Sequence, residues 1–291
     1  MSIRPRRSVL YMPGSNQRAL EKARGLSADA LVLDLEDSVG PEKKPEAREM
    51  VVAAVRAGGY GERELVIRAN GLDSEWGEAD IRAVAASGAD ALCLPKVESA
   101  DEISAALNIL DSAGAPKTLV LWAMIETPRG VLDIDAIARS DARLTTLVMG
   151  TTDLAKELRV PHTPDRIGLQ YALGRCVLAA RAHQKDILDG VYLDLEDAAG
   201  FRAACEQGRD MGFDGKTLIH PGQLADANAV FGPSEEAVER AHRIIAAWQQ
   251  AEAEGKGVVV VDGKLVEGMH IDEARRLLAI AGHIEELHGA A

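Results

Sequence analysis

Residues 29–37 read DALVLDLED, an apolar run that ends in acidic side chains. A continuous apolar run, rather than an alternating one, is typical of a strand covered on both faces, as in a parallel sheet. Seven further stretches have a similar pattern, and we expect a strand in each of them. They are residues 8–13, 64–70, 91–96, 118–127, 144–153, 189–195 and 216–220.

Helical patterns lie between these runs, for example over residues 15–26 and 99–110. Residues 163–184 form a long amphipathic stretch that carries Ile167, Tyr171 and Leu178. Strands that alternate with helices indicate a parallel sheet, and eight such strands are the number that closes a (β/α)8 TIM barrel. A doubly wound open sheet is the alternative, but no G-x-G-x-x-G follows the first strand to support a dinucleotide site.

Polar side chains stand at the C-terminal ends of most of the predicted strands. In a barrel these ends meet at one mouth, where the chemistry of such folds takes place. We therefore expect a functional site there rather than a set of solvated strand edges. The residues in question are Asp34, Glu36, Asp37, Arg68, Asn70, Lys96, Glu126, Asp153, Asp194 and His220.

The last 60 or so residues have a different pattern. We predict a helix over 234–254, a hairpin over 258–266 with an Asp262–Gly263 turn of type I′, and a helix over 271–287. The domain prediction is a barrel over 1–232 and a C-terminal lid or arm over 233–291. This arm either caps its own barrel or completes the site of a neighbouring subunit.

Composition excludes several classes of protein. The formal net charge is −13, whereas a binder of nucleic acid or of an anionic membrane shows a basic surplus. The three cysteines are widely spaced and indicate a reduced, cytoplasmic protein rather than a disulfide framework. We expect no secretory signal and no membrane span, because no apolar run is long enough.

Two acidic residues end neighbouring predicted strands. Glu126 and Asp153, with water in the remaining positions, are a typical donor set for Mg²⁺, and the lack of a His/Cys cluster argues against zinc. The alternative is that one of them caps a helix, because Asp153 precedes LAKEL and Glu126 precedes a Thr-Pro start.

Two cationic residues end other strands. The Arg68 guanidinium could bind a carboxylate or a thioester oxygen, or form an ion pair with Glu36 or Asp37, and these roles are compatible. Lys96 could neutralise the acidic mouth or stand in a structural ion pair. A Schiff-base role for Lys96 would require a depressed pKa.

A possible anion-binding corner follows the first strand. Arg18 and Lys22 are four residues apart and share a helix face, while Ser15 and Asn16 stand where backbone N–H groups attract anions. With Tyr11 they would form a phosphate-binding corner. The alternative is an ordinary solvated face.

Taken in order, seven motifs resemble the citrate lyase β-subunit-like family, which includes malyl-CoA, citramalyl-CoA and citryl-thioester lyases. The resemblance spans Arg7 to His288 and implies a (β/α)8 barrel in a homo-oligomer, a trimer or a hexamer. The motifs are RSVLYMPGSNQRALEKA (7–23), ADALVLDLEDSVGPEKKPEAR (28–48), VIRANG (66–71), LPKVE (94–98), AMIETPRGV (123–131), GTTDLAKEL (150–158) and DGKTLIHPGQ (214–223).

The resemblance also implies roles for residues. Glu126 and Asp153 would hold Mg²⁺, Arg68 would bind substrate beside it, and Glu36 and Asp37 would hold either water on the metal or the arginine. The residues expected to contact CoA, the acyl group or the oxo acid are Tyr11, Arg18, Lys22, Arg68, Lys96, Glu126, Ile219 and His220.

The C-terminal motif departs from the family pattern. The family reads G-K-M-I-D-x-P-H, with the aspartate acting as acid/base from a neighbouring subunit. Here residues 263–270 read GKLVEGMH, which places Glu267 at the aspartate position. Because a catalytic group misplaced by about 1 Å can cost on the order of 10²-fold in rate, this change affects the reaction subtype more than the fold.

The expected activity is Mg²⁺-dependent carbon–carbon cleavage or formation on an acyl-CoA or acyl-carrier thioester such as malyl-CoA or citramalyl-CoA. The products are acetyl-CoA and a 2-oxo acid, glyoxylate or pyruvate, with Glu267 as base and Arg68 steadying the thioester oxygen. Three alternatives stay open: a malyl-CoA thioesterase, a metal-dependent pyruvate aldolase on free acids, and a non-catalytic, complex-forming subunit.

Overall fold

Eight parallel strands close into a barrel in sequence order, with β8 paired back to β1. The computed structural model describes residues 4–253, 255 and 257–289. The predicted (β/α)8 barrel is confirmed. The strands are β1 Ser8–Pro13, β2 Ala30–Asp34, β3 Glu64–Arg68, β4 Ala91–Leu94, β5 Val120–Ile125, β6 Leu144–Met149, β7 Asp186–Asp189 and β8 Gly215–Leu218.

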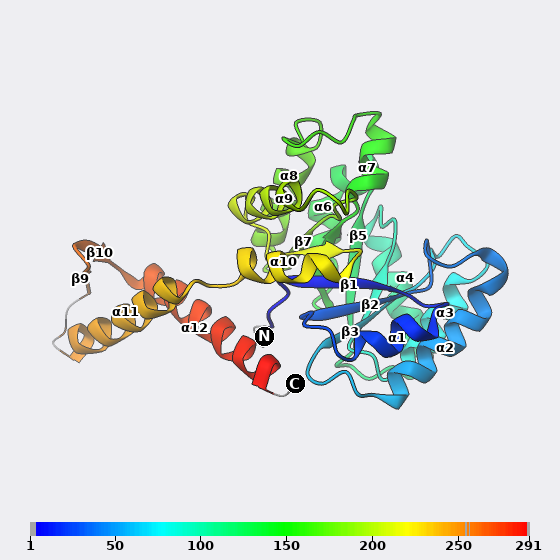
Figure 1. Ribbon diagram of the computed structural model, residues 1–291, viewed down its shortest axis with the longest axis horizontal. Coiled ribbons are helices and arrows are strands. Elements are labelled where there is room, and N and C mark those ends of the chain that lie inside the picture. The colour runs from blue at the N-terminus through cyan, green and yellow to red at the C-terminus, as the bar shows by residue number, and fades with distance from the viewer. Residues whose placement is uncertain (1–3, 254, 256, 290–291) are drawn as a thin grey trace. The chain divides into compact units, whose positions relative to one another are not determined.

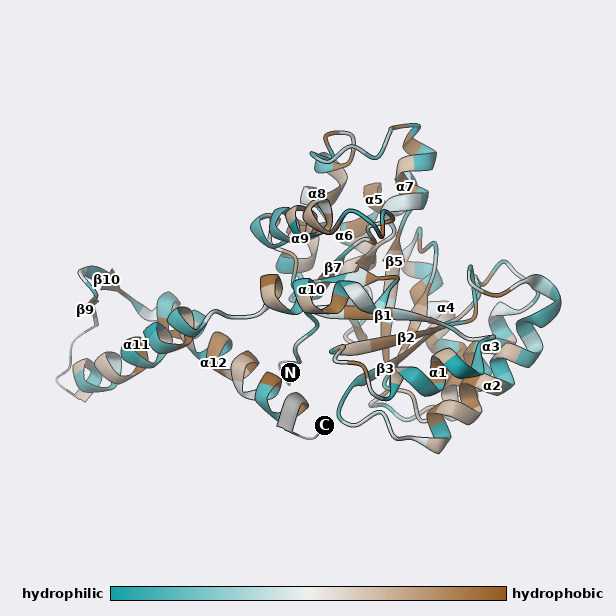
Figure 2. Cartoon of the chain, in the orientation of Figure 1, coloured by the Kyte–Doolittle hydropathy of each residue, from teal (hydrophilic) through white to brown (hydrophobic). Residues whose placement is uncertain are grey.

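Helices surround the barrel and connect its strands (Figure 1). Most present an apolar face to the strands, as Figure 2 shows by the brown strands and the teal outer surfaces of the helices. The helices of this part are α1 Gln17–Ala23, α2 Lys44–Ala57, α3 Gly77–Ala85, α4 Ala100–Ser112, α5 Pro128–Leu132, α6 Ile134–Ala138, α7 Thr151–Leu158, α8 Gln170–Ala182, α9 Ala198–Met211 and α10 Leu224–Phe231, with 3-10 turns η1 Pro41–Lys43 and η2 Pro221–Gln223.

Strand register determines which side chains enter the barrel. Val32 pairs with Val66, and two residues later Asp34 pairs with Arg68. The first pair belongs to the apolar cluster inside the barrel, which also contains Trp122. Because side chains alternate along a strand, Asp34 and Arg68 point the same way as that cluster, one layer nearer the mouth.

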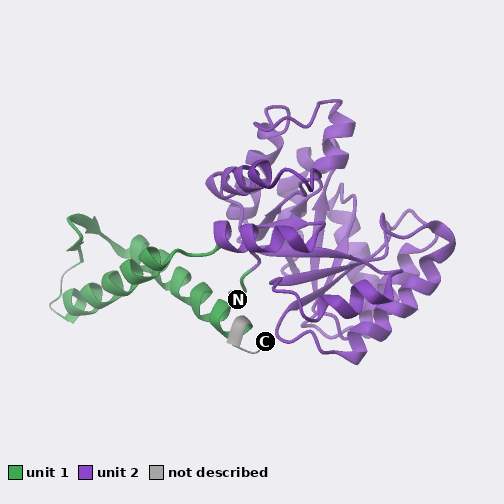
Figure 3. Cartoon of the chain, viewed as in Figure 1, with its two compact units in different colours: residues 1–5, 232–291 green, residues 6–231 purple. Residues whose placement is uncertain are grey.

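The chain divides into two compact units, shown in different colours in Figure 3: Arg6–Phe231, and Gly232–Ala291 together with the first five residues. The second unit contains α11 Glu235–Ala253, the hairpin of β9 Val259–Val261 and β10 Lys264–Val266, and α12 Gly268–Gly289.

The second unit has an apolar core of its own, which includes Ala241, Val261, Val266 and Ile271. The turn of its hairpin has φ 54° at Asp262 and 72° at Gly263, the left-handed pair that a type I′ turn requires. Among the described residues, no helix has the length and apolar character needed to cross a membrane.

The predicted strand over 189–195 is wrong, because β7 ends at Asp189 and a loop follows. Asp189 is buried and paired with Arg166 and Lys216 at 2.7 Å each, which fixes the end of the strand. Beyond it, Leu193 and Leu195 of the loop are exposed. Asp194 therefore lies in an exposed loop and not at a strand end.

The predicted apolar face of the stretch 163–184 is also wrong. The helix there, α8, buries small residues such as Ala172, Cys176 and Ala180 against the barrel. Ile167, Tyr171 and Leu178 are exposed instead. Small side chains let the helix approach the strands closely, and the larger apolar residues misled the sequence-based assignment.

The end of the barrel opposite the mouth is closed by an ion-pair cluster. Arg6 is buried and donates to both carboxylate oxygens of Glu64, at 2.7 and 2.9 Å. The same guanidinium pairs with Asp186 and lies 5.2 Å from the centroid of the Trp122 ring. Trp122 belongs to the apolar cluster inside the barrel, so Arg6 covers that cluster at the end of the barrel opposite the mouth.

We predict that Arg6→Met lowers the free energy of unfolding by about 3–5 kcal/mol, because it leaves buried Glu64 without its cation. Urea denaturation followed by circular dichroism measures the change. The matched control is Arg82→Met, which removes an exposed i,i+4 pair with Glu78 and should cost less than about 1 kcal/mol. Equal, small losses in the two variants would show that the cluster is dispensable.

Candidate active site

Arg68 is the centre of the barrel mouth. Its Nε and one terminal nitrogen donate to the two carboxylate oxygens of Asp34, at 2.6 and 2.8 Å, so the pair is bidentate. The two residues are register neighbours at the ends of β2 and β3. The strand pairing itself therefore sets this geometry, which holds the guanidinium in one orientation.

The other terminal nitrogen of Arg68, Nη1, faces two more carboxylates. It lies 2.9 Å from Glu36 and 3.3 Å from Asp37, and the guanidinium stacks 4.8 Å from the centroid of the Tyr11 ring. Burial by itself would lower the pKa of Arg68, but the charge of Asp34 outweighs it and the pKa lies well above its ordinary value. The ion pairs considered for Arg68 with Glu36 and Asp37 are both present.

Lys96 connects two parts of the mouth through an unusual backbone conformation. Its φ is 50°, the left-handed region that residues other than glycine seldom adopt. In this conformation its backbone N–H donates to Glu126 Oε1 at 2.8 Å, while its Nζ lies 3.5 Å from Glu36. Such local strain is often kept at functional sites, where it fixes the geometry of neighbouring groups.

Glu126 directly follows β5 and is only 2% exposed. Burial raises its pKa to about 7, and the nearby charge of Glu36 adds to the effect. A Cβ on Gly150 would stand 2.2 Å from Glu126 Oε2, so glycine is required there to leave room for the carboxylate. The buried acid is thus held in place but lacks enough positive charge to keep it ionised.

Asp153 lies in the first turn of α7, three residues past Gly150, rather than at the end of a strand. It is half-buried, and its charge influences both Lys96 and Glu126. The capping alternative is wrong for both acids, because the N-cap of α7 is Gly150, without a side-chain cap, and the side chain that caps α5 is that of Thr127. The position of Asp153 does not exclude a metal, because its carboxylate shares the electrostatic environment of Glu126.

The mouth carries more acid than base. Five carboxyl groups face two cations, Arg68 and Lys96; the acids are Asp34, Glu36, Asp37, Glu126 and Asp153. Burial, together with the neighbouring Asp37, also raises the pKa of Glu36, although Arg68 opposes the shift. Raised pKa values on buried acids indicate a site that favours an additional cation.

The donor chemistry fits a hard divalent cation. Across residues 4–253, 255 and 257–289, no group of three or more His, Cys, Asp and Glu side chains is arranged to hold a metal ion. Mg²⁺ needs no such cage, since it usually binds through one or two carboxylates and keeps water or substrate oxygens as its other ligands. Glu126 and Asp153 meet that requirement.

Part of the predicted anion corner is an open hollow of about 660 Å³ that includes Arg18, Asn16 and Glu21 in its lining, whereas Lys22 is not part of that lining and Tyr11 stacks on Arg68 at the barrel mouth. The Asn16 side chain accepts from the Ala19 N–H and caps α1, so it is occupied. Arg18 and Lys22 are exposed. The negative Glu21 in the same hollow weakens its attraction for phosphate, and the CoA-binding role of this corner stays a prediction.

Ile219 and His220 directly follow β8, as the resemblance requires. His220 Nδ1 accepts from Gly222 N–H at 3.0 Å, so the ring caps the turn η2. The backbone N–H groups of both residues donate to the buried Gln223 side chain, whose amide nitrogen in turn donates to the Tyr192 carbonyl. Sequence analysis missed Gln223, which joins the loops after β7 and β8.

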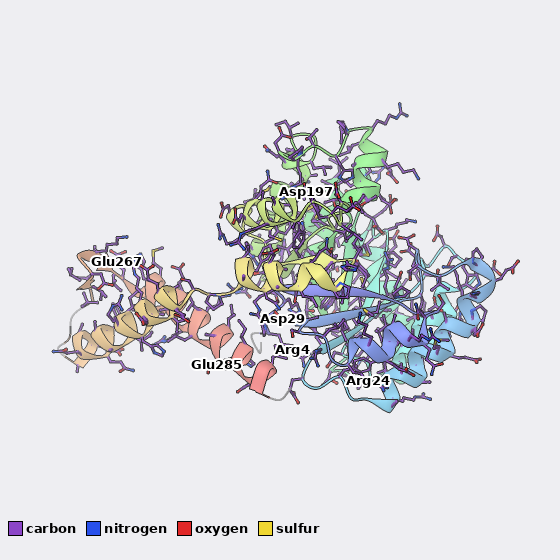
Figure 4. All side chains as sticks on the ribbon, viewed as in Figure 1. Arg4, Arg24, Asp29, Asp197, Glu267 and Glu285 are labelled. Atoms are coloured by element: carbon purple, nitrogen blue, oxygen red, sulfur yellow. The ribbon has the colours of Figure 1, made fainter. Side chains whose placement is uncertain are left out.

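Glu267 belongs to the second unit, between β10 and α12, and is exposed (Figure 4). Its backbone N–H donates to His270 Nδ1 at 3.1 Å, which caps the start of α12. The capping contact fixes the backbone of Glu267 and leaves its carboxylate at the surface. Its role as a base stays a prediction.

The sequence did not indicate the roles of three further residues of the site. Asp34 was noted as a polar strand end but not as the partner of Arg68, although the aligned ends of β2 and β3 are a signal for it. Gly150 precedes Thr151 and Thr152 in a motif, yet nothing in the sequence shows that it abuts Glu126. Lys44 is buried beneath the loop that carries Glu36, a position that only the fold reveals.

The chain is similar to proteins of known family over most of its length. The model of the HpcH/HpaI aldolase/citrate lyase family matches residues 7–221. A (3S)-malyl-CoA thioesterase from Cereibacter sphaeroides strain KD131 is 53% identical over 95% of each chain. The citrate lyase β subunit of Escherichia coli K12 is 37% identical, covering 96% of this chain and 94% of the relative.

Among solved structures, CitE from Mycobacterium tuberculosis in complex with magnesium, acetoacetate and coenzyme A is 28% identical with a TM-score of 0.74. The match covers 96% of this chain and 98% of that one. RipC from Yersinia pestis matches with a TM-score of 0.68 at 30% identity, over 82% of this chain and all of that one. The expected resemblance to the citrate lyase β-like group is confirmed.

Protonation of Glu126 should be visible in the stability of the protein. The pKa of Glu126 is higher in the folded protein than in the unfolded chain, where it is near 4.5. The contribution of the Glu126 carboxyl group to the free energy of unfolding is therefore complete below pH 4.5 and is lost as the pH rises through about 7. In buffer with EDTA, we predict that the free energy of unfolding of the wild type, relative to Glu126→Gln, falls by about 2 to 3 kcal/mol between pH 5 and pH 8.

Urea denaturation at several pH values measures this difference. Subtracting the Glu126→Gln curve removes the contributions of the other titrating groups that the two proteins share. Parallel pH profiles would mean that Glu126 titrates normally and that the mouth has no deficit of positive charge.

Proposed function

Because the chain belongs to the HpcH/HpaI aldolase/citrate lyase family, we propose that it is a Mg²⁺-dependent enzyme that hydrolyses a malyl-CoA-like thioester. The observation that carries the proposal is the buried Glu126 beside Asp153, in a mouth with five carboxyl groups and two cations. Identity of 53% to a (3S)-malyl-CoA thioesterase over nearly the whole chain supports the choice of substrate and reaction.

In this proposal Glu126 and Asp153 hold Mg²⁺, the metal that is bound in solved structures of the Mycobacterium tuberculosis protein. Bound there, Mg²⁺ supplies positive charge that polarises substrate carbonyl and carboxylate oxygens. Lys96 N–H keeps one Glu126 oxygen in place, and Gly150 leaves room for the other. The chain thus contributes a preorganised carboxylate rather than one that must reorient.

Arg68 orients the substrate in this scheme. Two of its nitrogens are committed to Asp34, whereas Nη1 is shared by Glu36 and the exposed Asp37. A substrate carboxylate or thioester oxygen that displaces Asp37 receives a hydrogen bond from a guanidinium that is already fixed in direction. Preorganised donors of this kind stabilise negative charge as it develops on a carbonyl oxygen.

In this proposal Glu267 is the group that transfers the proton. The arm over 233–291 delivers Glu267 to the site within a homo-oligomer, a trimer or a hexamer. The protein acts in the cytoplasm. The Glu267 carboxylate would take a proton from the water that attacks the thioester carbonyl carbon. The C–S bond then breaks, and the CoA thiolate leaves and takes up a proton, which gives the free thiol and the free acid. Arg18 and Lys22 would meet the phosphates of CoA, since the protein as a whole is negatively charged and needs a local cationic anchor.

The lyase reaction favoured by sequence analysis is the second candidate. The 37% identity to a citrate lyase β subunit supports it, and the same mouth would polarise a 2-oxo acid. In the condensation direction Glu267 takes a proton from the acetyl-CoA methyl group. In cleavage the 3-hydroxyl loses its proton, the carbon–carbon bond breaks, and Glu267 returns a proton to the acetyl-CoA enolate; Arg68 steadies the thioester oxygen in both directions.

The decisive assay incubates the purified protein with Mg²⁺ and a panel of malyl-, methylmalyl-, citramalyl- and citryl-CoA, and measures free thiol and 2-oxo acid separately. Free thiol without oxo acid is the result we expect. Release of oxo acid would replace hydrolysis with carbon–carbon cleavage, and no turnover of any thioester would overturn both candidates.

Glu126→Gln should reduce Mg²⁺-dependent turnover by at least about 10³-fold while leaving the circular dichroism spectrum unchanged, because it removes a charged ligand. Glu49→Gln, an exposed carboxyl group on α2, is the matched control and should keep wild-type activity. Normal turnover by Glu126→Gln would refute the metal assignment.

A further inference from the structure

Lys44 is a buried lysine whose position the proposed reaction does not explain. It is the first residue of α2 and is only 6% exposed. A cation at the start of a helix opposes the helix dipole, and lysine is almost never buried unless it is paired. Its three hydrogen-bond acceptors are nevertheless all neutral oxygens, so no ion pair accounts for the burial.

The contacts of Lys44 all lead to the barrel mouth. Its Nζ donates to the carbonyl oxygens of Leu35 at 3.1 Å and Glu36 at 2.9 Å, and to Asn70 Oδ1 at 2.5 Å. These three bonds use every donor of the ammonium group. The ammonium also lies 5.2 Å from the centroid of the Trp76 ring. Lys44 thus joins the loop that follows β2 to the residues that follow β3.

The Asn70 side chain completes the same clamp. Its amide nitrogen donates to the Leu35 carbonyl at 3.0 Å and to Asp80 at 2.6 Å, and Asp80 in turn accepts from Arg48 on α2 at 2.5 Å. Both Asn70 and Asp80 are buried. The carbonyl groups of Leu35 and Glu36 are therefore tied to α2 and α3 through the buried side chains of Lys44, Asn70 and Asp80.

We propose that Lys44 is a positioning residue that holds the backbone of Leu35 and Glu36, and so sets the Glu36 carboxylate against Arg68 and Lys96. The Glu36 side chain stands 2.9 Å from Arg68 and 3.5 Å from Lys96, so a shift of its backbone changes both contacts at once. The three hydrogen bonds of the Lys44 ammonium go to Leu35, Glu36 and Asn70, so its effect on Arg68 runs through Glu36. The kinetic consequence rests on the proposed function, whereas the clamp itself does not.

Lys44→Met tests the clamp because it keeps the length of the side chain and removes its donors. The matched control is Lys43→Met, which alters the exposed neighbouring lysine. Hydrogen exchange read by mass spectrometry on the peptide that contains residues 34–39 should speed up at least tenfold in Lys44→Met and stay unchanged in Lys43→Met. Unchanged exchange in Lys44→Met would overturn the proposal without any reference to activity.

A double-mutant cycle with Glu36→Gln tests the path of the effect. With the thioester substrate and Mg²⁺, Lys44→Met should lower kcat by about 10- to 100-fold in the wild-type background, as expected for displacement by about 1 Å. In the Glu36→Gln background it should lower kcat less than threefold. The KM for the thioester should stay within threefold, because the corner formed by Arg18 and Lys22 is untouched.

A general loss of packing would predict the opposite result. Lys44→Met would then lower kcat by the same factor in both backgrounds, which would overturn the positioning role. If Lys44→Met does not fold, Lys44→Gln retains a neutral donor and should give smaller changes of the same kind in exchange and kcat. Absence of turnover in the wild type would refute the proposed function, while the exchange measurement would still decide on the clamp.

Discussion

The bidentate pair between Arg68 and Asp34 is the interaction on which the mouth of the barrel depends. It places a buried guanidinium at the end of β3, and the register of β2 and β3 makes the pairing a consequence of the fold rather than of a mobile side chain. Removing either partner would leave a buried charge uncompensated, which is strongly destabilising. The other groups of the mouth are arranged around this fixed cation.

The acids beyond this pair are not neutralised. Asp34 and Arg68 balance one another, which leaves Lys96 to face Glu36, Asp37 and Glu126 with Asp153 nearby. Lys96 is half exposed and adopts a left-handed backbone conformation, so it contributes a backbone N–H to Glu126 as well as its charge. A divalent cation between Glu126 and Asp153 would remove the remaining deficit, and this requirement connects the electrostatics to the proposed chemistry.

Sequence patterns predicted the barrel well because continuous apolar runs reflect burial on both faces. The first run, residues 8–13, coincides with β1, and the acidic ending of DALVLDLED marks the mouth correctly. The pattern failed where apolar residues are not buried. Leu193 and Leu195 of the loop after β7, and Tyr171 and Leu178 of α8, are apolar like core residues but lie at the surface.

The charged residues of the site could be predicted from the sequence, but the residues that hold them in position could not. Acids and bases at strand ends are visible in the sequence because the mouth gathers them. The partner of Arg68 depends on strand register, and the roles of Gly150 and Lys44 depend on contacts between segments far apart in the chain. Close approach and buried hydrogen bonds leave no periodic signal, so only the folded chain reveals them.

The most direct measurement is the anomalous scattering of Mn²⁺, which stands in for Mg²⁺, in crystals grown with the metal. The account predicts one strong peak at about 2.1 to 2.2 Å from a carboxylate oxygen of Glu126 and another of Asp153, with Arg68 still paired to Asp34. A mouth without a peak, or a peak that touches neither of these two acids, would contradict it.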